Sequence, residues 1–175
     1  IKRLEILKPE IIISGSKKEK FLKDINKLSK FYKKKISIIN FSEDCSQEIS
    51  NKNLNYSDIL KKKDISLNIP YKPIKSNHPL FVLFTSGSTG EPKGVVHSNS
   101  PYLLYSKYTC IKQFGLNKSS VSLTASDAGW INGHTYALYG PLSIGCTSII
   151  IEKPYDLLNL DFLKKIISSL KVTNL

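Results

Sequence analysis

Residues 81–98, FVLFTSGSTGEPKGVVHS, begin with four apolar residues and continue as a loop of Thr, Ser and Gly that also holds one Glu, one Pro and one Lys. Small residues let backbone amides approach an anion closely, hydroxyl groups add hydrogen-bond donors, and Lys93 adds a positive charge. Ligands of open α/β sheets collect at the carboxyl ends of strands, which is where this loop is expected. The stretch therefore predicts a loop that binds a polyphosphate.

This loop differs from a Walker loop, in which Gly-Lys-Ser/Thr leads directly into a helix. Here Lys93 stands between Pro92 and Gly94, and Pro92 has no amide to donate to a phosphate. Composition alone would favour a different interpretation, a flexible Ser/Gly hairpin or linker.

The chain around the loop alternates short β-branched runs with amphipathic patterns, which is typical of the α/β class. Strands are expected at residues 11–13, 36–41, 80–84, 121–125 and 146–152, and helices at 17–35, 101–114, 134–144 and 161–170. The first three of these elements follow the order of a parallel βαβ unit. We therefore expect a mostly parallel sheet flanked by helices.

Two of the expected helices carry local signals at particular residues. Ser100 can cap free amides and Pro101 suits the first position of a helix, so the helix at 101–114 is expected to begin there. Gly140 and Pro141 are expected to interrupt the helix at 134–144.

The net charge of +12 raises the question of nucleic-acid binding. Residues 1–79 carry 18 Lys and Arg against 9 Asp and Glu, whereas residues 80–175 carry 8 against 5. The excess thus lies away from the loop, and Arg3 is the only arginine, although arginine is the residue that reads guanine edges and clamps phosphates. The lysine runs are interpreted as solvated surface.

The remaining composition indicates a soluble globular chain, 41% hydrophobic over 175 residues. Its apolar runs are far shorter than the roughly 20 residues that span a bilayer. Cys45, Cys110 and Cys146 are odd in number and widely spaced, so they are predicted to be reduced and structural in a cytoplasmic protein. The lack of Met and the final run KVTNL suggest a piece of a longer protein.

Ten of the eleven positions in Thr85–Val95 match T-S-G-S-T-G-x-P-K-G-V. This pattern resembles the phosphate-loop signature of the adenylate-forming (AMP-binding) enzymes, which include acyl-CoA synthetases, luciferases and peptide-synthetase adenylation domains. Residues 124–154, TASDAGWINGHTYALYGPLSIGCTSIIIEKP, resemble a second block of that family, in the form found in acetyl-CoA and propionyl-CoA synthetases.

The resemblance extends to LKPEIIIS near the start and LKVTNL at the end, and it is weakest over residues 16–75. It implies that residues 1–175 are part of the large AMP-binding domain of an adenylate-forming enzyme. Residues 42–79 are polar and are interpreted as a long connection within that domain, with a short helix at Tyr56–Leu60.

The resemblance also implies a reaction and its participants. Such enzymes convert ATP and a carboxylate to acyl-AMP and pyrophosphate, and then pass the acyl group to the thiol of CoA, with Mg²⁺ accompanying ATP. Lys93 matches the catalytic lysine position of the loop. The other positions that match phosphate handling or the backbone path around it are Thr85, Ser86, Gly87, Ser88, Thr89, Gly90 and Gly94.

In the second block, Trp130 matches the aromatic residue that walls the acyl pocket, and Ile131 and Asn132 match its neighbours near the CoA tunnel. Alternatively, Trp130 only packs in the core, as large aromatic side chains usually do. Asn132 replaces the small Thr or apolar residue that the resemblance leads us to expect, so the acyl group stays open.

Nearby polar residues are interpreted structurally. The family's first step starts from an ionised carboxylate and needs no general base, so His134 is expected to support the pocket by hydrogen bonding and His97 to neighbour the loop. His78 is expected in a turn and Asp127 in a turn or at a helix cap, and no metal ligands are assigned. Tyr102, Tyr136 and Tyr139 are assigned to packing.

Three hypotheses follow for function. The first is part of a short-chain acyl-CoA synthetase of the acetate–CoA ligase type, acting on small molecules without nucleic acid or membrane partners and in an unspecified oligomeric state. The family's adenine contacts, magnesium carboxylate and C-terminal catalytic lysine are expected beyond Leu175, so the isolated chain is expected to be inactive. The others are a degenerate phosphate-binding or nucleotide-binding remnant of the same family and, least favoured, a basic nucleic-acid binder.

Overall fold

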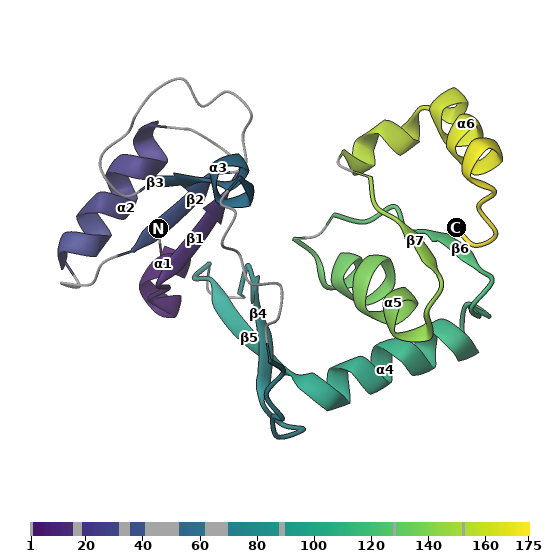
Figure 1. The fold of residues 1–175 in the computed structure, drawn as a ribbon, viewed down its shortest axis with the longest axis horizontal. Coiled ribbons are helices and arrows are strands. Elements are labelled where there is room, and N and C mark those ends of the chain that lie inside the picture. Colours follow the sequence, from purple (N-terminus) through teal and green to yellow (C-terminus); the bar gives the residue numbers. More distant parts are fainter. Residues whose placement is uncertain are drawn as a thin grey trace. The chain divides into compact units, whose positions relative to one another are not determined.

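The computed structural model describes residues 2–15, 19–31, 36–40, 53–61, 70–87, 90–127, 129–151 and 153–175. The chain divides into two compact units, Ile1–Lys72 and Pro73–Leu175 (Figure 1).

The first unit is a three-stranded parallel sheet with helices. Its elements are α1 (Lys2–Leu7), β1 (Ile11–Ser14), α2 (Glu19–Phe31), β2 (Ser37–Asn40), β3 (Asn53–Asn55) and α3 (Tyr56–Leu60). The strand order is β1-β2-β3, with Ile12 paired with Ile38. Ile12, Ile25 and Ile38 form the core, and each such burial is worth about 1.5–3 kcal/mol. The predicted βαβ unit and the short helix α3 are confirmed.

Two sequence expectations for this unit were wrong in detail. Strand β3 was not anticipated, because its Asn-Leu-Asn sequence has low strand propensity and is held by pairing with β2. Phe31 is 79% exposed although its helical spacing placed it on the apolar face, because it stands at the last residue of α2. Residues 41–52 and 62–69, which include half of the polar connection, lie outside the described residues.

The second unit begins with an antiparallel hairpin that carries the Ser/Gly loop. Strands β4 (Pro79–Thr85) and β5 (Lys93–Ser98) pair so that Thr85 stands opposite Lys93. Strand β5 was missed by the sequence analysis. The loop therefore joins two antiparallel strands, and the expectation that it follows a strand of a parallel sheet was wrong.

Helix α4 (Asn99–Lys112) starts two residues earlier than predicted. Ser98 is its N-cap and makes no side-chain cap bond. Instead, the first free amides bond to a preceding turn, since Asn99 N donates to His78 O (2.8 Å) and Ser100 N donates to Ser76 O (3.0 Å). A cap by Ser100 is therefore unnecessary, and Pro101 sits in the first turn, where amides have no intrahelical partner.

A π-helical segment, η1 (Gly133–Tyr139), continues directly into α5 (Gly140–Ile144), so the predicted interruption at Gly140 and Pro141 was wrong. Pro141 offers no amide to the preceding turn. Two hydroxyl groups from elsewhere bond carbonyls of that turn: Thr124 donates to Tyr136 O (3.0 Å) and Ser148 donates to Ala137 O (2.7 Å).

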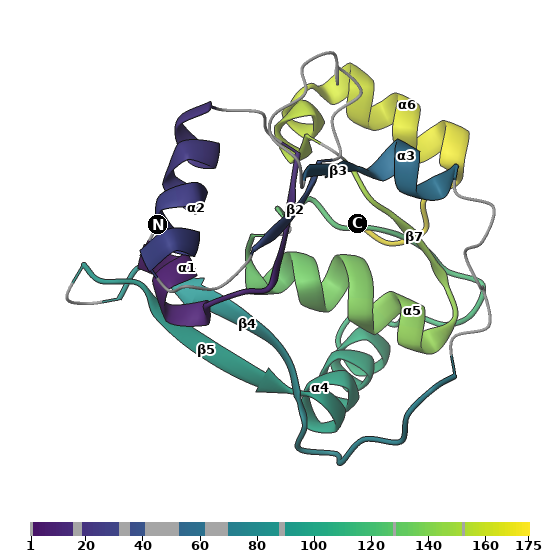
Figure 2. The same ribbon diagram turned by 60° about the vertical axis from the view of Figure 1, so that its left-hand side comes forward.

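Gly140 also brings this helical run close to α4 (Figures 1 and 2). A Cβ at Gly140 would clash with Cys110 Sγ and would lie 2.8 Å from Thr135 O and 3.1 Å from Ser106 O. Ser106, which is fully buried, donates to Tyr102 O within its own helix (2.8 Å), so burying this polar face leaves its hydroxyl satisfied.

The rest of the unit is a parallel strand pair followed by helices. Its elements are β6 (Val121–Leu123), β7 (Thr147–Ile149), η2 (Pro154–Leu158) and α6 (Leu160–Leu170). β6 and β7 pair in parallel. Asn174 lies beside β6, and its carbonyl accepts from Leu123 N (2.9 Å). The α/β class is confirmed, but the described strands form three separate sheets, one of them the antiparallel hairpin.

Cys110 and Cys146 are free thiols buried together with Leu116, as the structural interpretation predicted. Burial raises the pKa of the Cys110 thiol to about 11, so it stays protonated at neutral pH. Cys45 lies outside the described residues. None of the helices in the described part of the chain combines the length and apolar character that a bilayer crossing requires.

Candidate functional site

The loop between β4 and β5 has the backbone shape that its glycines allow. Gly87 and Gly90 adopt left-handed conformations, with φ of 65° and 78°, and Gly90 N donates to Gly87 O (3.3 Å). For a residue with a Cβ, the left-handed conformation costs roughly 1–2 kcal/mol more than the right-handed one. The turn geometry therefore requires glycine at these two positions.

The predicted phosphate-binding residues gather on this hairpin. Thr85, Ser86 and Lys93 are exposed, and a Cβ at Gly87 would lie 3.5 Å from Lys93 Cγ, so the stem of Lys93 passes beside the loop. Ser88 and Thr89 lie outside the described residues. A cation, hydroxyl groups and a glycine turn thus share one surface, and these are groups that fit a polyphosphate.

Gly94 has a packing role in addition to the one predicted for it. It pairs with Phe84 across the hairpin, and a Cβ there would lie 3.0 Å from Val82 Cγ1 and 3.3 Å from Phe84 Cε1. Gly94 therefore leaves room for the Phe84 ring at the base of the loop.

The two loop glycines provide a test of the turn. At Gly87 a methyl group would clash with Glu91 O, whereas at Gly90 nothing lies within 4 Å. We expect Gly90→Ala to cost about 1–2 kcal/mol from backbone strain alone, and Gly87→Ala to cost more and also to weaken pyrophosphate binding. Chemical denaturation measures the loss of stability, and titration calorimetry with pyrophosphate measures the binding. Equal effects of the two variants would contradict the described turn.

The three predicted substrate residues of the second block lie directly before η1, and Asn132 is its N-cap. Trp130 is 72% exposed, and Ile131 and Asn132 are also exposed. Asp127 forms the turn before them, as predicted, with its Oδ1 accepting from Gly129 N (2.6 Å) and its carbonyl accepting from Trp130 N (3.0 Å).

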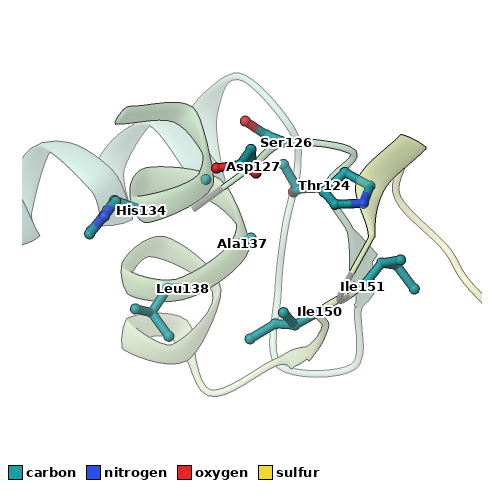
Figure 3. A pocket seen from close by; sticks show the side chains of 10 residues that line it. Thr124, Ser126, Asp127, His134, Ala137, Leu138, Ile150 and Ile151 are labelled. Carbon is teal, nitrogen blue, oxygen red and sulfur yellow. The ribbon is translucent and has the colours of Figure 1, made fainter. Parts of the chain in front are cut away.

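A cavity of about 310 Å³ is lined by residues of this block, beyond the carboxyl ends of β6 and β7. Figure 3 shows Ala137 and Leu138 on the helical side facing Ile150 and Ile151. Its lining residues are Thr124, Ser126, Asp127, Gly133, His134, Ala137, Leu138, Ile150, Ile151 and Pro154. The lining includes the residues directly after Asn132, but Trp130, Ile131 and Asn132 are not part of it.

An aromatic cluster connects the hairpin to the second block. The Phe81 ring stacks with His97 (centroids 4.8 Å apart), with His134 (4.7 Å) and with Tyr139 (5.6 Å), and meets Tyr102 edge-on (4.9 Å). The packing roles predicted for Tyr102 and Tyr139 and the place of His97 beside the loop strand agree with this arrangement. The hydrogen bond expected of His134 is not found at its buried Nδ1, which has no partner within the described residues, so its ring contributes by stacking. Phe81 itself was missed, because nothing in a strand sequence tells which distant rings its side chain meets.

Other titratable residues take structural positions. His78 is exposed in a turn, with Nδ1 donating to Pro79 O (2.9 Å), as predicted. Within the described ranges, no group of three or more His, Cys, Asp and Glu side chains is arranged to hold a metal ion.

Comparison with known proteins identifies what the chain is similar to. The AMP-binding enzyme family matches residues 3–175. Acetyl-coenzyme A synthetase 1 of Candida glabrata is 49% identical over 92 residues, covering 53% of this chain and 13% of the yeast protein. Acetyl-coenzyme A synthetase 2 of Kluyveromyces lactis is 56% identical over 84 residues, covering 48% of this chain and 12% of that protein.

The fold matches a crystal structure of an acyl-CoA synthetase from Brucella canis, with a TM-score of 0.74, 19% sequence identity, and coverage of 98% of this chain and 29% of that one. The segments of this chain that match its curated relatives thus cover about an eighth of the length of those relatives.

Proposed function

Because this chain belongs to the AMP-binding enzyme family, we propose that the protein carrying it is an acyl-CoA synthetase of the acetate–CoA ligase type. The reaction converts ATP and a short-chain carboxylate to acyl-AMP and pyrophosphate, and then transfers the acyl group to CoA. The observation that carries the proposal is the hairpin loop, where two left-handed glycines and the exposed Lys93 share one surface.

In the first step a carboxylate oxygen bonds to the α-phosphorus of ATP, and the bond from that phosphorus to the bridging β-oxygen breaks. Its electron pair leaves with pyrophosphate. Lys93 and the donors of Thr85, Ser86, Ser88 and Thr89 stabilise the charge that develops there, which is the usual source of a large rate effect. Mg²⁺ bound with ATP would neutralise part of the same charge.

In the second step the CoA sulfur bonds to the acyl carbon and AMP leaves with the electron pair of the broken C–O bond. We assign Trp130, Ile131 and Asn132 to the acyl and thiol side of the site, because they precede the residues that line the cavity of about 310 Å³. We place the reaction in the cytoplasm, where reduced thiols such as Cys110 and Cys146 persist.

Exchange of labelled pyrophosphate into ATP tests the proposal, with acetate, propionate and butyrate supplied separately to the expressed protein that carries this sequence. We expect exchange that depends on the added acid, and acyl-CoA when CoA is present. Pyrophosphate binding without exchange for any acid would favour the degenerate remnant. Steeply salt-dependent nucleic-acid binding without exchange would favour the basic binder.

A further inference from the structure

The Phe81 ring occupies a position between the two parts of the proposed site. It stands four residues before Thr85 on β4 and pairs with His97, which stands four residues after Lys93 on β5. The Phe81–His97 pair thus lies at the same distance along each strand from the loop. The stack of Phe81 with His134 at 4.7 Å leads from this pair to η1.

The same cluster holds the backbone of the second block. His134 N donates to Trp130 O (3.3 Å), and the Thr135 hydroxyl donates to Ile131 O (2.8 Å). Because that hydroxyl proton is engaged, the 2.8 Å contact between Thr135 Oγ1 and Tyr102 Oη makes Tyr102 the donor. Tyr102 also meets the Phe81 ring edge-on, so the cluster reaches the carbonyls of two predicted substrate residues.

His134 contributes to this arrangement through its ring. Its Nδ1 is buried and, within the described residues, has no hydrogen-bond partner. If the ring proton is on Nε2, Nδ1 is a buried acceptor without a donor. This costs less free energy than a buried N–H without an acceptor. A substitution of His134 that keeps the arrangement must therefore keep its ring stacks with Phe81 and Tyr139.

We infer that Phe81, stacked between the hairpin and η1, is a positioning residue that sets the phosphate loop relative to the segment Trp130–Asn132. The inference rests on the proposed function, in which a carboxylate at that segment must meet an α-phosphorus held beside the loop. Reacting atoms must approach to about 3–3.5 Å, and a misplacement of about 1 Å can cost 100-fold in rate. Four rings around one phenylalanine provide a rigid link of this kind.

The Phe81→Leu variant tests this link, with Phe114→Leu as the matched control. Phe114 meets Tyr136 of η1 edge-on at 5.0 Å, so the control loses one aromatic contact to the same helix without touching the hairpin. We expect Phe81→Leu to lower kcat for adenylate formation about 10–100-fold with a smaller change in KM for ATP, and Phe114→Leu to stay within about threefold. His134→Phe, which keeps a ring, should retain activity that His134→Leu loses.

Trp130 supplies a readout that does not depend on turnover, because it is the only tryptophan of residues 1–175 and its side chain is exposed. The Trp130→Phe variant of the expressed protein identifies the part of the fluorescence that comes from Trp130. Pyrophosphate binding to the loop should change Trp130 fluorescence in the wild type. In Phe81→Leu, calorimetry should still detect pyrophosphate binding, while the fluorescence change is lost.

The outcomes separate the two proposals. A wild type that binds pyrophosphate but shows no acid-dependent exchange contradicts the proposed function, whatever Trp130 reports. A wild type that exchanges normally, with a Phe81→Leu variant that matches Phe114→Leu in kcat and in fluorescence, overturns the positioning role. The positioning role is also overturned if Phe81→Leu and Phe114→Leu lower the melting temperature and the activity by equal amounts, because the loss of activity then reflects the loss of stability alone.

Discussion

The Lys93→Ala variant is expected to form acyl-adenylate about 10²–10³ times more slowly than the wild type, because it removes a positive charge from the place where pyrophosphate departs. Lys93 is exposed at the first position of β5, opposite Thr85, so its truncation leaves no buried group unpaired. Stability should therefore change by no more than about 0.5 kcal/mol. Single-turnover formation of the adenylate and thermal unfolding measure the two quantities.

Lys107→Ala is the matched control for charge, since Lys107 is an exposed lysine of α4 in the same unit. Its exchange rate should equal that of the wild type. If Lys93→Ala kept full activity, or if Lys107→Ala lost as much, the loop would have no special part in the chemistry and the phosphate site would lie elsewhere.

The Gly140→Ala variant is expected to lose about 3 kcal/mol of stability or more, near the upper end of overpacking effects. The added methyl group would clash with Cys110 Sγ, and Thr135 O and Ser106 O would lie 2.8 and 3.1 Å away. The gain of about 1 kcal/mol in helix propensity from Gly to Ala does not offset this. Denaturant unfolding followed by circular dichroism gives the free energy of unfolding.

Gly145→Ala serves as the comparison, because Gly145 has a φ of 83° but a methyl group added there would meet nothing within 4 Å. It should cost only the left-handed strain of roughly 1–2 kcal/mol. Combining Gly140→Ala with Cys110→Ala should recover part of the loss, since the sulfur clash disappears while both carbonyl contacts stay. A Gly140→Ala variant as stable as the wild type would contradict the close packing of α4 against the π-helical run.

Local patterns in the sequence were enough to predict much of this molecule. The βαβ order of the first unit, helix α6 and the turn at Asp127 were all inferred from residues that neighbour one another in the chain. For α6 the decisive groups are adjacent, because Asn159 Oδ1 accepts from Asp161 N (3.0 Å) and Phe162 N (3.1 Å). Periodicity, caps and glycine conformations are short-range effects, so the sequence expresses them directly.

Tertiary contacts decided the features that the sequence analysis missed. Helix α4 starts at Asn99 because carbonyls of Ser76 and His78 accept its first amides. η1 continues into α5 without a break at Pro141 because Thr124 and Ser148 supply hydroxyl donors. The partners of Phe81 come from β5, α4 and η1, up to 58 positions along the chain at Tyr139. By itself the sequence determined which chemical groups stand in the proposed phosphate loop and in the second block. Only the tertiary structure decided how they are joined, because stacking and hydroxyl bonds between distant segments exist only after the chain has folded.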